Sequence, residues 1–465
     1  MNAVLALCVA FHLFVTVLDL AGVAWHPLLL WGFLGAGAAV LWKGRARRDR
    51  RLPTDLGWGD GLAFVGFALF SLFAFTLWVT TPDFVFHWGL KGHRFFLVRA
   101  VDYAFLAQPE SWPLHPDYPN LLPELYGAAS LLLGRFDAGL LQLWSVLFFG
   151  LIVLASRASL KAAGVDRFAL QAGVALTGLV PATFGLAHRM AGAADWMIAL
   201  ALVAAAPALL RPADRSGDLL VGLAAAFAAA SKIEGVPLAF FLCLVQLLRR
   251  LAAERRLDWR GVLWLGAPPL AVIFPWLWRC LRHGLFQDFT SGAFELERGA
   301  AIFPALLEAA RSPSWYGFSA LALATPLLFA VRRLRPLAAV LSLQLLFDLY
   351  AYFAAPVDTH FYVITSFPRL LLQVVPALLV AGVAALTTTA PPPRLPLLPP
   401  QGPGSFRPTP PRALGTAGGS FRPLPPARRG RSARCGRGGR TWSRAPASAP
   451  RAAPPGSSNR RRTRR

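Results

Sequence analysis

Long, continuous apolar runs alternate with short polar segments from residue 1 to about residue 388. The runs show no period of two, which argues against a β-barrel. A membrane-spanning helix needs about 20 mostly apolar residues, and lipid-exposed backbone is satisfied only in helices or closed barrels. The pattern therefore predicts an all-α polytopic membrane protein of about twelve spans. The expected spans are 2–19, 23–42, 60–80, 137–156, 165–187, 192–210, 217–231, 234–250, 261–280, 314–331, 337–353 and 370–388.

The distribution of basic loops predicts an orientation for these spans. Loops rich in Lys and Arg tend to stay in the cytoplasm, and five such loops, beginning with KGRARRDRR at 43–51, fall on the same side of the twelve-span arrangement. Both termini are then cytoplasmic, and segment 81–136 becomes a long first outer loop. Within it, the apolar stretch 121–134 leaves no room for another span, so we expect a helix lying in the membrane interface.

Composition changes sharply near the end of the chain. Residues 391–465 hold 17 arginines, 17 prolines and no Lys, Asp or Glu, so they supply +17 of the net charge of +24. A segment this polar and proline-rich cannot bury a core, which predicts a disordered tail over 389–465 beyond a transmembrane domain at 1–388. Such a tail either touches anionic lipid headgroups or nucleic acid or has no defined role, and the last of these is favoured. The charge of the folded part therefore gives no reason to expect a nucleic-acid partner.

Several common kinds of site are not indicated. The four cysteines show neither metal-ligand spacing nor a disulfide framework. The sequence contains no P-loop, no Rossmann fingerprint, no GxSxG and no HExxH motif. The first run lacks a basic leader and a cleavage site, which favours a retained first helix over a signal peptide.

The polar segment from Thr81 to Pro123 is the clearest candidate for chemistry. It follows the apolar run 60–80 and opens with Asp83, a carboxylate that could accept a proton from an incoming hydroxyl group. A solvated acid at a helix end is the alternative interpretation. His87 and Lys91 follow within two turns and are candidate substrate-binding residues.

The sequence His115-Pro-Asp-Tyr-Pro119 lies further along the same segment. Its two prolines restrict the backbone on either side of Asp117 and Tyr118. A rigid loop that holds His115, Asp117 and Tyr118 suits substrate or metal binding, and a plain proline-rich turn explains it equally well.

Asp195 stands just inside the outer start of the span 192–210. Asp83 is expected at the same boundary, so the two acids could meet and hold a divalent metal ion through oxygen ligands. Alternatively, the helix dipole alone stabilises Asp195 by about 0.3–1 kcal/mol.

Three further charged residues are candidates for substrate binding, and the two cations among them, Lys232 and Arg369, could bind a phosphate group. Lys232 and Glu234 join two short apolar runs, and Arg369 stands at the expected outer entry of the last span. The planar guanidinium group suits phosphate oxygens. For Lys232 and Arg369, simple ion pairing or snorkelling remains the alternative.

Taken in order, these segments resemble the bacterial GT-C glycosyltransferases, most closely the Rgt-type and protein-mannosyltransferase-like branch. The resemblance covers about residues 60–388. It rests on Asp83 with HWGLKG at 87–92, HPDYPNLLP at 115–123, AGAAD at 191–195, SKIEG at 231–235 and SFPRLLLQVVP at 366–376.

The resemblance implies an inverting transfer of a sugar from a polyprenyl-phosphate donor to a glycan, lipid or protein acceptor. Asp83 would be the general base, Asp195 would help to bind a metal ion or the donor phosphate, and Lys232 and Arg369 would hold that phosphate. The chain departs from better-known members because Pro82 and Phe84 flank Asp83 where an adjacent acidic pair is usual. It also lacks a sizeable C-terminal outer domain, so metal dependence and acceptor class stay open.

The expected location is the bacterial inner membrane, with the site facing the periplasm or the outside. A lipid-linked sugar flippase or transporter, or a surface-glycan polymerase or ligase, is the alternative function. Transporters tend to place ionisable groups near the middle of the bilayer, whereas the acids here are expected at the outer ends of spans.

Overall fold

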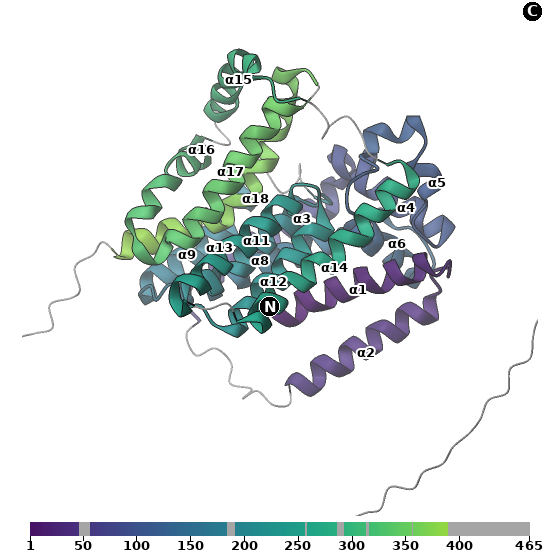
Figure 1. The fold of residues 1–465 in the computed structure, drawn as a ribbon, viewed down its shortest axis with the longest axis horizontal. Coiled ribbons are helices and arrows are strands. Elements are labelled where there is room, and N and C mark those ends of the chain that lie inside the picture. The colour runs from purple at the N-terminus through teal and green to yellow at the C-terminus, as the bar shows by residue number, and fades with distance from the viewer. Residues whose placement is uncertain are drawn as a thin grey trace, which may run out of the picture. The chain divides into compact units, whose positions relative to one another are not determined.

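The structure is a computed structural model of an all-helical chain (Figure 1). Helices account for 84% of the described residues, which contain no strands, and the all-α fold class is therefore confirmed for them. The expected tail at 389–465 lies outside the described residues and stays a prediction. The structure describes residues 1–45, 56–183, 191–255, 258–285, 293–312, 316–355 and 357–388.

The helices follow one another with short connections. The longer ones are α1 (Asn2–Leu20), α2 (Pro27–Arg45), α3 (Trp58–Leu77), α4 (Gly89–Val98), α6 (Leu121–Leu133), α8 (Leu143–Ala162), α9 (Arg167–Thr183), α11 (Asp195–Leu210), α12 (Arg215–Ser231), α13 (Gly235–Glu254), α14 (Trp259–His283), α15 (Gly299–Arg311), α16 (Tyr316–Leu323), α17 (Arg335–Ala354) and α18 (Thr359–Thr388). Shorter helical turns are η1 (Trp78–Thr80), η2 (Phe84–Trp88), α5 (Tyr103–Leu106), η3 (Pro109–Leu114), α7 (Ala138–Leu141), η4 (Leu296–Arg298), η5 (Thr325–Ala330) and η6 (Arg332–Leu334).

Several helical stretches have the length and composition of membrane spans. Among the described residues there are seven: Asn2–Leu20, Trp58–Thr80, Ala138–Ala162, Gly235–Glu254, Trp259–His283, Arg332–Ala354 and Thr359–Thr387. Further apolar helices, including α11, are shorter than a full crossing. These helices support a membrane-embedded protein, while the count of twelve spans and the orientation of the termini stay predictions.

Helix α11 forms the centre of the core. It packs against α8, α12 and α18, and its residues are buried from Asp195 to Leu210 with the exception of Pro207. A helix that is apolar all round is stable only when neighbours cover it on every side. The acid at its first position is therefore carried into the interior of the protein.

Close packing of α3 on α9 depends on small residues. A Cβ atom added to Gly66 would lie 2.2 Å from the carbonyl oxygen of Gly178, a distance that only backbone movement could relieve. Glycine at these positions lets the two helix backbones touch, as at small-residue interfaces of membrane helices.

The structure corrects several expected boundaries. The expected span 314–331 is not one helix, because α16 ends at Leu323 and a separate 3₁₀ turn, η5, begins at Thr325 with Pro326 in its first turn. The last helix begins at Thr359 instead of residue 370, so Arg369 lies inside α18 and not at its entry. Pro368 does not stop α18, whose faces pack on α11 and α15.

Segment 81–136 also differs from an open loop. It folds into η2, α4, α5, η3 and α6, and α6 packs on α4. The expected helix at 121–134 exists as α6, but most of its residues are buried against the protein. Its apolar residues therefore pack mainly inside the protein, and its placement in a membrane interface stays a prediction.

Candidate active site

Five of the predicted site residues lie together although they are distant in sequence. One Nη2 atom of Arg369 lies 2.6 Å from Asp83 Oδ2 and 3.6 Å from Asp195 Oδ2. On the other side of Asp195, Lys232 Nζ donates to Asp195 Oδ1 at 3.0 Å and lies 2.9 Å from Glu234 Oε1. The tertiary structure thus joins three acids and two cations into one chain of ion pairs.

A sixth residue completes this carboxylate–cation cluster, which we define as Asp83, Asp195, Lys232, Glu234, Arg369 and Gln373. The side-chain amide of Gln373 donates to Asp195 Oδ1 at 2.7 Å. Gln373 lies four residues after Arg369 on α18, so both side chains project from the same face of that helix. Sequence reasoning missed Gln373, although a glutamine inside the apolar run RLLLQVVP was a usable signal.

Four separate elements position the cluster. Asp83 immediately precedes η2, a five-residue π-helix from Phe84 to Trp88. Short π-helical turns cost stability and occur often at functional sites. Asp195 is the first residue of α11, and Lys232 and Glu234 lie in the tight turn between α12 and α13.

Exposure divides the cluster into an open part and a buried part. The side chains of Asp83 and Arg369 are 18% and 27% exposed, whereas those of Lys232 and Asp195 are 3% and 0% exposed. Asp83 and Arg369 are therefore more accessible than Lys232 and Asp195, although the Asp83 Oδ2 atom that faces Arg369 is itself buried. Lys232 and Asp195 form a buried ion pair beside the two more accessible residues.

The electrostatic environment of Asp83 favours proton uptake. Burial raises the pKa of the Asp83 carboxyl group above its ordinary value, because a low dielectric disfavours the charged form. The Arg369 guanidinium group lowers that pKa in part, and the Asp195 carboxylate raises it again. A carboxylate with a raised pKa is a stronger base than a solvated aspartate.

The cluster does not fit the expected metal ion in this arrangement. Among the residues that the structure describes, no group of three or more His, Cys, Asp or Glu side chains could hold a metal. Asp83 and Asp195 do converge, but the guanidinium group of Arg369 contacts both carboxylates where a shared cation would bind. Metal dependence therefore stays a prediction.

Three of the other predicted residues, His87, His115 and Tyr118, form an aromatic wall together with Trp88, which was not predicted. The ring centroids of His87 and Trp88 are 3.9 Å apart, and those of His115 and Tyr118 are 4.6 Å apart. The His87 and His115 centroids are separated by 5.0 Å. Burial lowers the pKa of both His87 and His115, and the positive charges of Lys91 and, to a smaller extent, Arg369 lower it further.

Lys91 and Asp117 lie behind the aromatic wall. The Lys91 ammonium group donates to the carbonyl oxygen of His115 at 2.9 Å and lies 5.2 Å from the centroid of the Trp88 ring. Burial lowers the pKa of Lys91 to about 7, against a raising effect of Asp117. Both side chains are buried, so we assign them to supporting the wall, and direct substrate contact by either stays a prediction.

A fourth acid lies near the cluster and was not expected from the sequence. Asp348 on α17 is buried and accepts a hydrogen bond from Gln344 at 2.9 Å. Its carboxyl group interacts electrostatically with Glu234, Lys232 and Asp195. A lone acid inside the run 337–353 is unusual in a membrane segment and marks a functional position by default, a signal that was available in the sequence.

The turn before α11 fixes the position of Phe84, the neighbour of Asp83. Gly192 has a φ of +78°, and a Cβ atom there would lie 2.6 Å from Phe84 Cδ2. Its backbone N–H donates to Ser145 Oγ at 2.7 Å, and its carbonyl oxygen accepts from the Tyr126 hydroxyl group at 3.1 Å. This turn therefore helps to position Phe84 at the start of η2, and with it the preceding residue Asp83.

We predict that Gly192→Ala destabilises the protein more than Gly134→Ala does. Both glycines have a positive φ, but a Cβ atom at Gly134 would meet nothing within 4 Å. The backbone cost, about 1–2 kcal/mol per residue, is shared by the two variants, so the difference between their melting temperatures reports the contact with Phe84. Equal melting temperatures would contradict the prediction.

Comparison of this chain with protein-family models, with curated proteins and with solved structures gives no match. The described residues form an all-helical protein with helices capable of crossing a membrane and a partly exposed carboxylate–cation cluster.

Proposed function

We propose that this protein is a GT-C type glycosyltransferase of the bacterial inner membrane. It would move a sugar from a polyprenyl-phosphate donor to an acceptor on the outer face, with both termini in the cytoplasm. The observation that carries the proposal is the convergence of Asp83 and Asp195 on the guanidinium group of Arg369. The resemblance of the surrounding segments to GT-C enzymes is a second, weaker support.

Asp83 is the proposed general base. The acceptor hydroxyl oxygen attacks the anomeric carbon of the donor sugar, and the bond from that carbon to the phosphate oxygen breaks. The bonding electron pair leaves with the phosphate, and the hydroxyl proton passes to the Asp83 carboxylate. One direct displacement inverts the configuration at the anomeric carbon and needs one base, whereas retention needs a second displacement.

Arg369 and Lys232 are the proposed phosphate partners. A departing phosphate gains negative charge, which preorganised cations stabilise. Arg369 is the more accessible of the two, and its planar group can hold two oxygens at once. Lys232 is already paired with Asp195 and Glu234, so we assign it mainly to the local charge balance.

The ion pair between Arg369 and Asp83 gives the donor a role in activating the base. While Arg369 pairs with Asp83 at 2.6 Å, the carboxylate is a weaker proton acceptor, because a cation stabilises its charged form. A phosphate group that accepts the hydrogen bonds of the guanidinium group would release Asp83 from this ion pair. The base would then become strong only when a donor is bound.

We predict a shift in pH dependence for Arg369→Gln. The base must be ionised, so transfer falls as the pH drops through the Asp83 pKa, which lies above its ordinary value. Arg369 lowers that pKa, so its removal raises the pKa further, and the acid limb of kcat/KM should move to higher pH. Kinetics of labelled sugar transfer in nanodiscs would measure this. An acid limb that stays in place would remove Asp83 as the titrating base.

The proposal itself is tested by transfer chemistry. The full chain in lipid nanodiscs, supplied with polyprenyl-phosphate sugars, should release polyprenyl phosphate and glycosylate an acceptor drawn from membrane extracts. Movement of the intact lipid-linked sugar across proteoliposomes without any transfer would instead support a flippase.

A further inference from the structure

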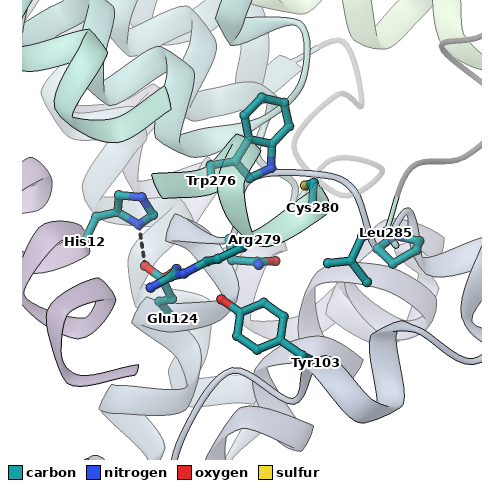
Figure 2. A pocket seen from close by; sticks show the side chains of 9 residues that line it. His12, Tyr103, Glu124, Trp276, Arg279, Cys280 and Leu285 are labelled. Carbon is teal, nitrogen blue, oxygen red and sulfur yellow. Dashed lines mark hydrogen bonds and ion pairs between the residues drawn. The ribbon is translucent and has the colours of Figure 1, made fainter. Parts of the chain in front are cut away.

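A small polar cavity lies between α1, α6 and α14, away from the residues of the carboxylate–cation cluster (Figure 2). About 10 Å³ of the cavity is open to the centre of a water molecule. A buried water molecule needs about 10–15 Å³ by this measure. The cavity therefore has room for one water molecule and for no larger ligand.

Three polar atoms on the cavity wall have no hydrogen-bond partner within the described part of the chain. They are Glu124 Oε1, Asn120 Oδ1 and the hydroxyl oxygen of Tyr103. Glu124 is fully buried and Asn120 is 7% exposed, so bulk solvent does not satisfy these atoms. Because nearly all buried polar groups in folded proteins are hydrogen-bonded, the three atoms require a common partner inside the cavity.

The neighbouring polar groups are already engaged with the protein. Glu124 Oε2 lies 2.6 Å from His12 Nδ1, a contact that Figure 2 shows. Arg279 Nη2 donates to the carbonyl oxygen of Thr16 at 2.8 Å. These contacts hold the two side chains in place and leave one oxygen of the Glu124 carboxyl group facing the cavity.

The hydrogen-bonding capacities of the three atoms match those of water. The carboxyl oxygen of Glu124 and the amide oxygen of Asn120 accept hydrogen bonds, and the Tyr103 hydroxyl group can donate one. A water molecule has two hydrogens to donate and can accept in return. A cation would meet the guanidinium group of Arg279, which lines the same cavity, and like charges at this distance repel each other.

We propose that the cavity binds one water molecule as a structural ligand. The water donates to Glu124 Oε1 and Asn120 Oδ1 and accepts a hydrogen bond from the Tyr103 hydroxyl group. Tyr103 begins α5, whereas Asn120 and Glu124 lie one turn apart at the start of α6. The water therefore joins two elements that make no direct hydrogen bond through these atoms.

The same water supports the segment His115–Pro119, which carries two rings of the aromatic wall. Pro116 lines the cavity, and Asn120 directly follows the segment. On the adjoining side, Trp276 Nε1 donates to the carbonyl oxygen of Asp117 at 3.0 Å. The segment is thus held from α14 and from the water site, and this role does not depend on the proposed glycosyl transfer.

An electron-density or cryo-electron-microscopy map of the full chain in nanodiscs, at about 2 Å resolution, tests the site directly. We expect one isolated peak at hydrogen-bonding distances, about 2.7–3.2 Å, from Glu124 Oε1, Asn120 Oδ1 and the Tyr103 hydroxyl oxygen. No peak in a map that resolves other buried water molecules would overturn the proposal. A peak with oxygen distances near 2.4 Å would overturn it too, because such distances indicate a bound cation.

Tyr103→Phe gives a second test that needs no map. If the hydroxyl group donates to a water molecule, its removal loses a hydrogen bond and should lower the melting temperature by about 2 °C. If the hydroxyl group is buried without a partner, its removal should raise the melting temperature instead. The phenylalanine ring keeps the stacking on His283, so the variant should fold.

Tyr126→Phe is the matched control for this variant. The Tyr126 hydroxyl group donates to the carbonyl oxygen of Gly192 at 3.1 Å, so its removal loses a hydrogen bond that the protein itself provides. Both variants should therefore show a lower melting temperature. A decrease in Tyr126→Phe together with an unchanged or higher melting temperature in Tyr103→Phe would contradict the water site.

Discussion

Replacing Asp83 with Asn should lower sugar transfer by about 10²–10⁴-fold, the usual contribution of a general base. Asparagine keeps the size of the side chain but cannot take the acceptor's proton. Asp83 is partly exposed and lies outside the buried core, so the variant should still insert into membranes with a nearly unchanged melting temperature. Transfer of labelled sugar by the purified full chain measures the loss.

Glu110→Gln is the matched control for this experiment. Glu110 is an exposed acid in the same polar segment, so its removal should leave transfer unchanged. Full activity in Asp83→Asn would exclude Asp83 as the base. A large fall in melting temperature with a proportionate loss of activity would instead show that the ion pair with Arg369 is structural.

Replacing Lys232 with Met should cause the largest loss of stability. Lys232 is the buried partner of Asp195, at 3.0 Å. Breaking a buried pair by removing one member costs about 3–5 kcal/mol, because the remaining charge is left uncompensated. We expect a lower melting temperature in detergent and a lower yield from membranes.

A second substitution tests the reason for that loss. In Lys232→Met combined with Asp195→Asn, one of the two carboxylates that lose Lys232 is gone and only Glu234 stays without its cation, so the double variant should be more stable than Lys232→Met alone. Arg369 and Gln373 still contact the residue at position 195, so recovery should be partial. Additive losses in the two single variants would contradict a direct pair.

The site could be predicted in part because ionisable residues are costly inside apolar runs. Asp83, Asp195, Lys232 and Arg369 stood out by that cost alone. Their pairing could not be read from the sequence, since it depends on how α11 and α18 pack and on where the chain enters η2. The expected position of Arg369 at the entry of a span that starts at residue 370 was wrong, because α18 begins at Thr359 and continues through Pro368.

The contact between His12 and Glu124 is a second case in which the sequence showed the residues but not their pairing. Glu124 lies in the run LLPELYG, and His12 lies in the first apolar run. Each is a single polar residue on an apolar helix and gives no sign of its partner. Only the packing of α1 and α6 brings them within 2.6 Å.

By itself, the sequence determined the all-helical class and several of the stretches capable of crossing a membrane. These properties follow from the apolar character of contiguous residues, because a helix satisfies its own backbone hydrogen bonds. The tertiary structure decided which charges neutralise one another, which acid remains accessible and where unpartnered polar atoms enclose a cavity. Several of those features arise from contacts between residues more than 100 positions apart, such as Asp195 with Arg369 and His12 with Glu124, and local sequence pattern carries no record of such contacts.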